Sequence, residues 1–129
     1  MRTSFAIGCA ALLALAGCAS APKQMPPPPA DALDRLDLYL QQTLRDPSSA
    51  QQYSVAPEPF PCFYLRWDWC LCYRLNAKNG FGAYTGVKYG MVDFHPETGE
   101  ISDASARGLR MCRGKDYVDR DASPIHLPK

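Results

Sequence analysis

The chain has 129 residues, with 14 lysines and arginines against 13 aspartates and glutamates, for a formal net charge of +1. This length is that of a single domain. The balanced charge, without a basic stripe or a polybasic segment, argues against binding of nucleic acid and against electrostatic binding to an anionic membrane surface.

The first apolar segment, residues 5–16, follows the basic residue Arg2 and precedes a cysteine. It is shorter than the roughly 20 residues of a membrane-spanning helix, so it predicts the hydrophobic region of a signal peptide. Its end, "LAGC" at 15–18, resembles the lipobox of bacterial lipoproteins. The resemblance implies removal of residues 1–17 and acylation of Cys18, so that lipid ties the chain to a membrane. In such lipoproteins an aspartate after the cysteine favours the inner membrane, so Ala19 indicates the outer membrane, facing the periplasm. An ordinary secretory cleavage site is the alternative, with Ala14, Ala16 or Ala19 as the small residue before the cut.

Residues 18–30 are predicted to form a tether. Four consecutive prolines at 26–29 favour extended polyproline II, which builds no core and holds a domain away from its anchor. The alternative is a proline-rich ligand for an aromatic groove.

A helix is predicted from Asp31, as its cap, to about Arg45. Four leucines, Leu33, Leu36, Leu40 and Leu44, recur at three- and four-residue spacing and mark the buried face. Asp34 places a favourable negative charge in the first turn. Pro47 ends the helix, and "DPSS" at 46–49 suits one further short helical turn.

Strands are predicted from residue 53 onward, where aromatic and β-branched residues alternate with turn residues. Prolines 57, 59 and 61 interrupt an early edge strand. Segments 70–78 and 81–94 are predicted to be strands that pair through a type I′ turn at Asn79-Gly80. A second turn is predicted at 96–99, followed by a short strand near 100–105. Residues 31–113 are therefore expected to form one α+β domain, an N-terminal amphipathic helix on a small antiparallel meander. Residues 114–129 are expected to form a polar, loose tail.

Four cysteines follow the lipidation site: Cys62, Cys70, Cys72 and Cys112. In an oxidising compartment they predict two disulfides. Cys70 and Cys72 lie two apart on a strand, with β-carbons nearly 7 Å apart, which is too far for a disulfide. Two pairings remain open, because either of these neighbours could reach Cys112.

Two stretches, "LRDPSSAQQY" and "CYRLNAKNGFGAYTG", resemble a group of small bacterial periplasmic and lipoprotein domains. The similarity covers residues 44–90, with a further cysteine matched by Cys112; the insert "PCFYLRWDWCLC" departs from it. That group carries a cysteine at the position of Cys72, so the resemblance implies the pairs Cys72–Cys112 and Cys62–Cys70. It implies a fold and a compartment but no activity.

No catalytic arrangement follows from residue spacing. Ser102, Asp103 and Ser105 suit loop capping, and His95 and His126 are most simply surface residues. The C-x7-C-x-C spacing lacks the paired knuckles of a zinc site and the C-x2-C of a redox site. We expect no cofactor and no metal.

The candidate binding residues fall in two groups. The first is aromatic and bracketed by Cys62 and Cys70; the second is polar and precedes the Asn79 turn. The alternatives are that the aromatic side chains cover the core and that the polar ones form the turn. The sequence thus predicts a non-catalytic, lipid-anchored domain that binds an envelope protein or glycan. The alternative is a small envelope enzyme, or an enzyme inhibitor, that uses the 62–70 loop. The aromatic candidates for binding are Phe63, Tyr64, Trp67 and Trp69, and the polar candidates are Asn76, Lys78 and Asn79.

Overall fold

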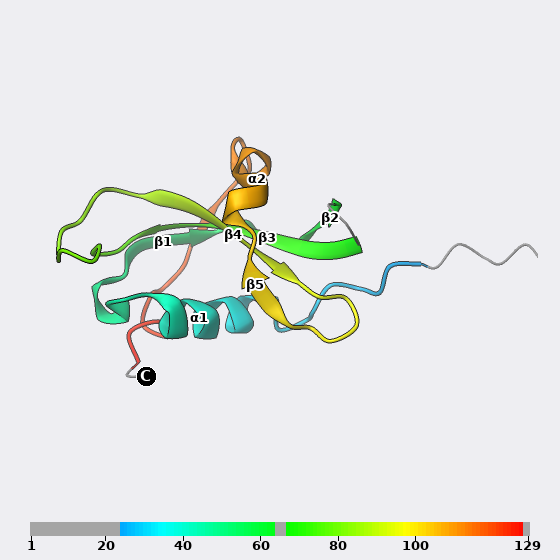
Figure 1. Cartoon of the computed structure of the whole chain (residues 1–129), viewed down its shortest axis with the longest axis horizontal. Coiled ribbons are helices and arrows are strands. Elements are labelled where there is room, and N and C mark those ends of the chain that lie inside the picture. Colours follow the sequence, from blue (N-terminus) through cyan, green and yellow to red (C-terminus); the bar gives the residue numbers. More distant parts are fainter. Residues whose placement is uncertain (1–23, 64–66, 128–129) are drawn as a thin grey trace, which may run out of the picture.

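The chain is an α+β structure with one helix against each face of an antiparallel sheet (Figure 1). The computed structural model describes residues 24–63 and 67–127, without the side chains of Phe63, Trp67 and Arg107. The predicted fold class, an N-terminal helix on an antiparallel sheet stapled by disulfides, is confirmed. The helices are α1 (Ala32–Thr43), the short 3-10 helix η1 (Pro47–Ser49) and α2 (Ser105–Cys112). The strands are β1 (Gln51–Val55), β2 (Phe60–Phe63), β3 (Trp67–Asn76), β4 (Lys88–Phe94), β5 (Ile101–Asp103) and β6 (Val118–Asp119).

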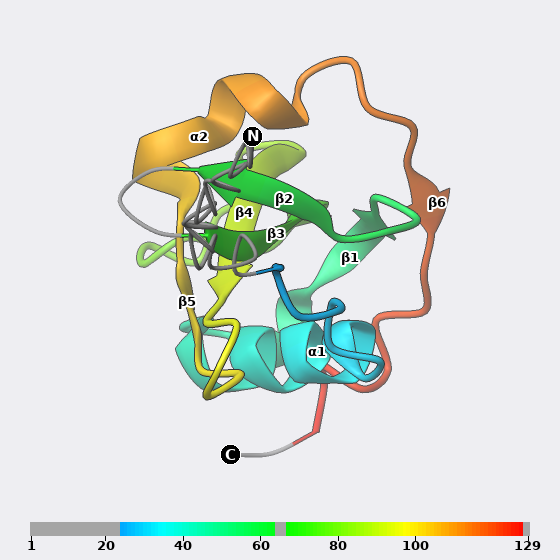
Figure 2. The same ribbon diagram turned by 90° about the vertical axis from the view of Figure 1, so that its right-hand side faces the viewer.

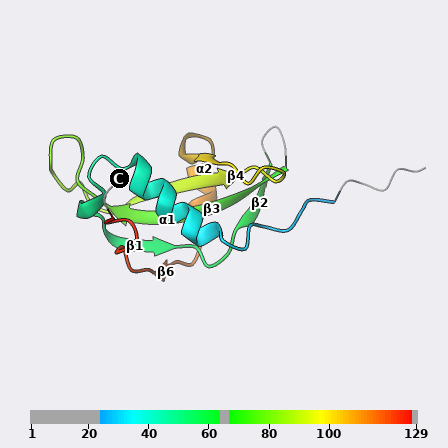
Figure 3. The same cartoon turned by 90° about the horizontal axis from the view of Figure 1, so that it is seen from below.

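Helix α1 lies where the leucine spacing predicts it and buries the predicted face. Leu36 and Leu40 are fully buried, and Leu33 and Leu44 pack partly buried against the same core. The helix covers one face of the sheet, as the views from the side and from below show (Figures 2 and 3). Its leucines therefore supply the apolar layer that the sheet needs on that face.

Both ends of α1 differ from the prediction. The Asp31 side chain makes no capping hydrogen bond; its carboxylate instead accepts one from Arg35 Nε at 2.8 Å, one turn along the helix. This hydrogen bond lowers the pKa of Asp31. The helix ends at Thr43 rather than near Arg45, because Leu44 already has an extended backbone. The short turn predicted at 46–49 is present as η1.

Strand β3 is the centre of the sheet and is paired along both edges. Strand β4 runs along one edge, while β2 and β1 share the other, with Phe60 opposite Cys70 and Val55 opposite Tyr73. The strand order is β5-β4-β3-β1-β6, and β2 to β5 form the predicted meander. The prolines at 57 and 59 lie between β1 and β2, which explains why the two are separate strands.

The connection between β3 and β4 differs from the predicted two-residue turn. Instead of strands at 70–78 and 81–94, the two strands are separated by a loop of residues 77–87. Gly80 lacks the positive φ of a type I′ turn, which Gly82 adopts at 79°. The Asn79 side chain builds a wider turn, because its Oδ1 accepts hydrogen bonds from the N–H groups of Phe81 and Ala83. Asn79 N–H also donates to Ala83 O at 2.9 Å.

The segment after β5 departs most from the sequence prediction. Helix α2 was not predicted; it lies on the face of the sheet opposite α1 (Figure 1). The described part of the expected loose tail is packed: β6 pairs with β1, Ile125 is fully buried, and His126 Nε2 lies 2.7 Å from Ala50 O. The helical signal is weak because Gly108, a residue type unfavourable in a helix interior, lies inside α2, where its φ of -154° is non-helical. In the tail, Ile125 is the fully buried apolar side chain, and Tyr117 and Ala122 pack partly buried against the same core.

Gly90 is required by close packing on the α1 side of the sheet. It lies opposite Tyr73 in the β3–β4 ladder, and a Cβ at this position would overlap the Tyr73 ring. The absence of a side chain on β4 thus makes the space in which the Tyr73 ring is largely buried.

Candidate functional site

A hollow of about 610 Å³ opens on the sheet at the end where the 77–87 loop begins. We call it the Arg74 groove. It is lined by residues of β1, β3, β4, β6 and their flanks: Gln52, Tyr53, Ser54, Arg74, Val87, Tyr89, Asp119 and Arg120.

The strand register places a row of polar side chains along this groove. Ser54 lies opposite both Arg74 and Asp119, and Arg74 lies opposite Tyr89. Directly opposite residues of an antiparallel pair point to the same face of the sheet. Cys72, two residues before Arg74, shares that face and is bonded to α2, so the row lies on the α2 side.

The Arg74 guanidinium is held on two sides without a carboxylate partner. Its Nε donates to Ser54 Oγ at 3.0 Å, and its Cζ lies 4.4 Å from the centre of the Tyr117 ring. Among the described residues, no aspartate or glutamate forms an ion pair with it. Neither contact uses the terminal Nη groups, which therefore remain as donors on a fixed, planar cation.

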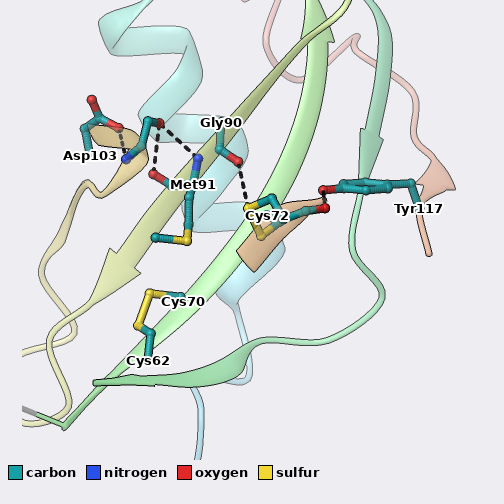
Figure 4. Close-up of a disulfide and its surroundings, with 9 residues drawn as sticks. Cys62, Cys70, Cys72, Gly90, Met91, Asp103 and Tyr117 are labelled. Atoms are coloured by element: carbon teal, nitrogen blue, oxygen red, sulfur yellow. Dashed lines mark hydrogen bonds between the residues drawn. A yellow bond between two sulfur atoms is a disulfide. The ribbon is translucent and has the colours of Figure 1, made fainter. Parts of the chain in front are cut away.

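Tyr117 is positioned through the Cys72–Cys112 disulfide (Figure 4). Its hydroxyl donates to Cys112 O at 2.8 Å, and its ring meets Tyr89 edge-on at a centroid distance of 5.7 Å. Partial burial raises the pKa of Tyr117, so the hydroxyl remains a protonated donor. The disulfide thus fixes the ring that carries the Arg74 guanidinium.

A β-bulge shapes the wall of the groove on β1. The register shifts by one residue between Gln51, opposite Asn76, and Ser54. Within the bulge, Gln52 has a φ of 53°, which is uncommon for a residue other than glycine. Its Oε1 accepts a hydrogen bond from Asn76 Nδ2 at 2.9 Å, and Asn76 Oδ1 is buried without a partner among the described residues. Bulges and strained backbone of this kind often occur beside functional sites.

Tyr53 and Arg120 belong to a buried cluster behind the groove. Asp37 of α1 is 4% exposed; its Oδ2 lies 2.6 Å from Arg120 Nη2, and its Oδ1 accepts from the Tyr53 hydroxyl at 2.8 Å. Burial, reinforced by the Asp37 charge, raises the pKa of Tyr53 and keeps it protonated. Since Asp37 neutralises Arg120, Arg74 is the unpaired cation among the described residues that line the groove.

Of the aromatic group predicted as a binding patch, only Trp69 has a described side chain. Tyr64 and the side chains of Phe63 and Trp67 lie outside the described residues, so their role stays a prediction, as does an enzyme-inserting function of this loop. Trp69 is half-buried and packs against the core, and its Nε1 donates to Pro26 O at 2.8 Å. It therefore contacts the segment predicted as a tether, and it does not line the Arg74 groove. The predicted Cys62–Cys70 pair is confirmed.

The predicted polar group is divided between three local roles. Asn76 orients Gln52 at the groove, and Asn79 closes the 77–87 loop. Lys78 donates its backbone N–H to Ser49 Oγ, and its Nζ lies 5.8 Å from the centre of the Tyr84 ring. Only Asn76 contributes to the groove. Sequence reasoning missed Arg74, although it follows Cys72 at the two-residue spacing of one strand face.

The histidines and cysteines have structural partners. His95 Nδ1 accepts hydrogen bonds from the N–H groups of Glu97 and Thr98, and so holds the β4–β5 turn. All four predicted disulfide cysteines are bonded in the pairs Cys62–Cys70 and Cys72–Cys112, which leaves none of them as a free thiolate. Within the described part of the chain, no cluster of three or more His, Cys, Asp or Glu residues could hold a metal ion.

Comparison with known proteins gives no relative: no family model, curated protein or solved structure matches this chain. Over residues 24–63 and 67–127, no helix has the length and apolarity needed to cross a membrane. A function must therefore follow from the groove and from the chemistry of the residues around it.

Proposed function

We propose that this chain is a lipid-anchored, non-catalytic domain of the bacterial envelope that binds a glycan in the Arg74 groove. The lipobox-like segment ending at Cys18 supports the anchor, and the two disulfides suit an oxidising compartment.

The observation that carries the binding role is Arg74 itself. A guanidinium fixed by Ser54 and Tyr117, without a carboxylate partner, lines a hollow large enough for one or two sugar rings. Beside it, Tyr89 and Val87 are 42% and 44% exposed. Ligand sites typically combine such apolar surface with a few fixed polar groups, and an aromatic side chain offers both.

The position of the groove also supports this role. Residues 24–30, which lead from the predicted anchor, leave the domain at one end, and the 77–87 loop projects from the other (Figures 1 and 3). Arg74, Val87 and Tyr89 lie at the loop end of β3 and β4. A domain held by its tether would therefore present the groove away from the membrane, toward the cell wall.

Co-sedimentation of the mature, detergent-solubilised protein with purified sacculi, the insoluble cell-wall glycan, tests the binding role. We expect the wild type to sediment with the sacculi, and Tyr89→Ala to weaken binding several-fold because it removes exposed aromatic surface. Leu38→Ala is the matched control, since Leu38 is exposed on α1 away from the groove. Wild-type protein that stays in the supernatant would contradict the proposal.

The anchor is tested separately by fractionation. Because acylation requires the thiol, Cys18→Ser is expected to leave the detergent-soluble outer-membrane fraction. Wild-type protein found free in the periplasm with an unmodified amino terminus would contradict lipidation without bearing on the groove.

A further inference from the structure

We infer that the Arg74 groove recognises a carboxylate group on the glycan, which the Arg74 guanidinium binds through its two Nη groups. The inference rests on the proposed function and specifies the chemistry of its ligand.

The contacts of Arg74 decide which edge of the guanidinium is available. Ser54 Oγ accepts from Nε at 3.0 Å, and the Tyr117 ring covers one face of the cation. The edge formed by the two Nη groups remains, and its parallel N–H bonds match the two oxygens of a carboxylate. A lysine ammonium lacks this paired geometry.

The cation is held in place before any ligand arrives. Ser54 is 2% exposed, and Tyr117 is fixed by its bond to Cys112 O and by the edge-on contact with Tyr89. A long, flexible side chain normally loses rotamer freedom when it binds a ligand. Here most of that freedom is already lost in the folded protein, which favours affinity.

Asp119 sets the charge that the groove accepts. It lies opposite Ser54, on the same face of the sheet as Arg74, and lines the same hollow. Its carboxylate repels every anion, but it repels a phosphate monoester with nearly two negative charges about twice as strongly as a carboxylate with one. One arginine with an acidic residue across the groove therefore suits a singly charged carboxylate.

The surroundings exclude an extended peptide strand as the carrier of that carboxylate. Strands β1 and β3, which form the floor, are each paired on both edges, so a peptide cannot join them as an added strand. Gln52 uses its Oε1 to accept from Asn76, which leaves its amide nitrogen as a donor for a hydroxyl or acetamido oxygen.

Chemical blocking of the ligand tests the inference on the full mature protein. The probes are native sacculi and sacculi whose carboxylates have been amidated with a carbodiimide and ammonium. We expect amidation to weaken wild-type binding about ten- to hundredfold, the range for losing a charge-assisted, two-point hydrogen bond. Arg74→Met should bind native sacculi as weakly and should be insensitive to amidation. Arg74→Lys should recover only part of the affinity.

Arg110→Met is the matched control, because Arg110 is an exposed arginine of α2 outside the groove, and it should bind like the wild type. If Arg74→Met does not fold, binding of Arg74→Lys to native sacculi and of the wild type to amidated sacculi still tests the inference. Undiminished wild-type binding to amidated sacculi, or undiminished binding by Arg74→Lys, overturns the inference while leaving glycan binding intact. Failure of the wild type to bind native sacculi instead overturns the proposed function and the inference together.

Discussion

Replacing Arg120 by methionine is expected to destabilise the fold strongly, because it strips a buried carboxylate of its cation. Asp37 is 4% exposed and holds Arg120 through Nη2 at 2.6 Å and Nε at 3.2 Å. The methionine keeps most of the aliphatic stem, so the perturbation is chiefly the loss of charge and hydrogen bonds.

The magnitude follows from what remains around Asp37. After the substitution, the Tyr53 hydroxyl at 2.8 Å is the neutral donor left to the carboxylate. Removing one partner of a buried ion pair costs about 3–5 kcal/mol. Because the Arg120 side chain is itself 29% exposed, water can reach the vacated position, and we expect the lower end of that range, about 3 kcal/mol.

Urea unfolding with the disulfides intact measures this change, since urea does not screen charge. The melting temperature should fall by about 12–24 °C for a domain of this size. Arg113→Met, an exposed arginine outside the cluster, should stay within about 0.5 kcal/mol of the wild type.

A double variant makes the test specific to the ion pair. Asp37→Leu combined with Arg120→Met removes both charges, and it should be more stable than Arg120→Met alone, because no carboxylate is left buried and unpaired. A loss below about 1 kcal/mol in Arg120→Met, or a double variant less stable than the single one, would refute the reasoning.

Three further predictions concern the disulfides, the tyrosines and a glycine. Replacing both cysteines of the 72–112 bridge, which spans 40 residues, should lower the free energy of unfolding in urea by about 4 kcal/mol. Replacing those of the 62–70 bridge, which spans 8, should lower it by about 2.5 kcal/mol. Equal losses for the two bridges would contradict this prediction. Burial raises the pKa of Tyr53 and Tyr73, so the protonated forms stabilise the fold below about pH 10 and this contribution is lost as the pH rises further. A phenolate absorbance titration should show these two tyrosines ionising only on unfolding, and their ionisation together with the exposed ones would be inconsistent with burial. Gly90→Ala should cost about 1–3 kcal/mol or more, because the new methyl overlaps the Tyr73 ring, and a melting temperature equal to the wild type would disprove the close approach.

Local sequence patterns were sufficient for the elements whose energetics are local. The leucine spacing of α1 gives its buried face, since a helix with one apolar stripe has one way to cover a sheet. The turn at 96–99 and η1 follow from their proline, glycine and aspartate residues. The two-residue spacing of Cys70 and Cys72 excludes their pairing through strand geometry alone.

Long-range pairing decided the rest. Segment 105–127 has weak local preferences, and its order comes from the Cys72–Cys112 bond, the ladder to β1 and the Arg120–Asp37 ion pair. The sequence of segment 105–127 alone predicts none of these contacts, because each partner residue lies elsewhere in the chain.

The candidate site shows the same division. The sequence by itself determined the fold class and a strand on which Cys72 and Arg74 share a face, whereas the signal-like leader stays a prediction outside the described residues. Only the tertiary structure brought Tyr117 beneath the Arg74 guanidinium and Asp119 into the lining of the same groove, because those residues come from a segment more than forty positions away. Side chains so distant in the chain meet only where strand pairing and a covalent bridge hold them, and that is why the groove has no local signature.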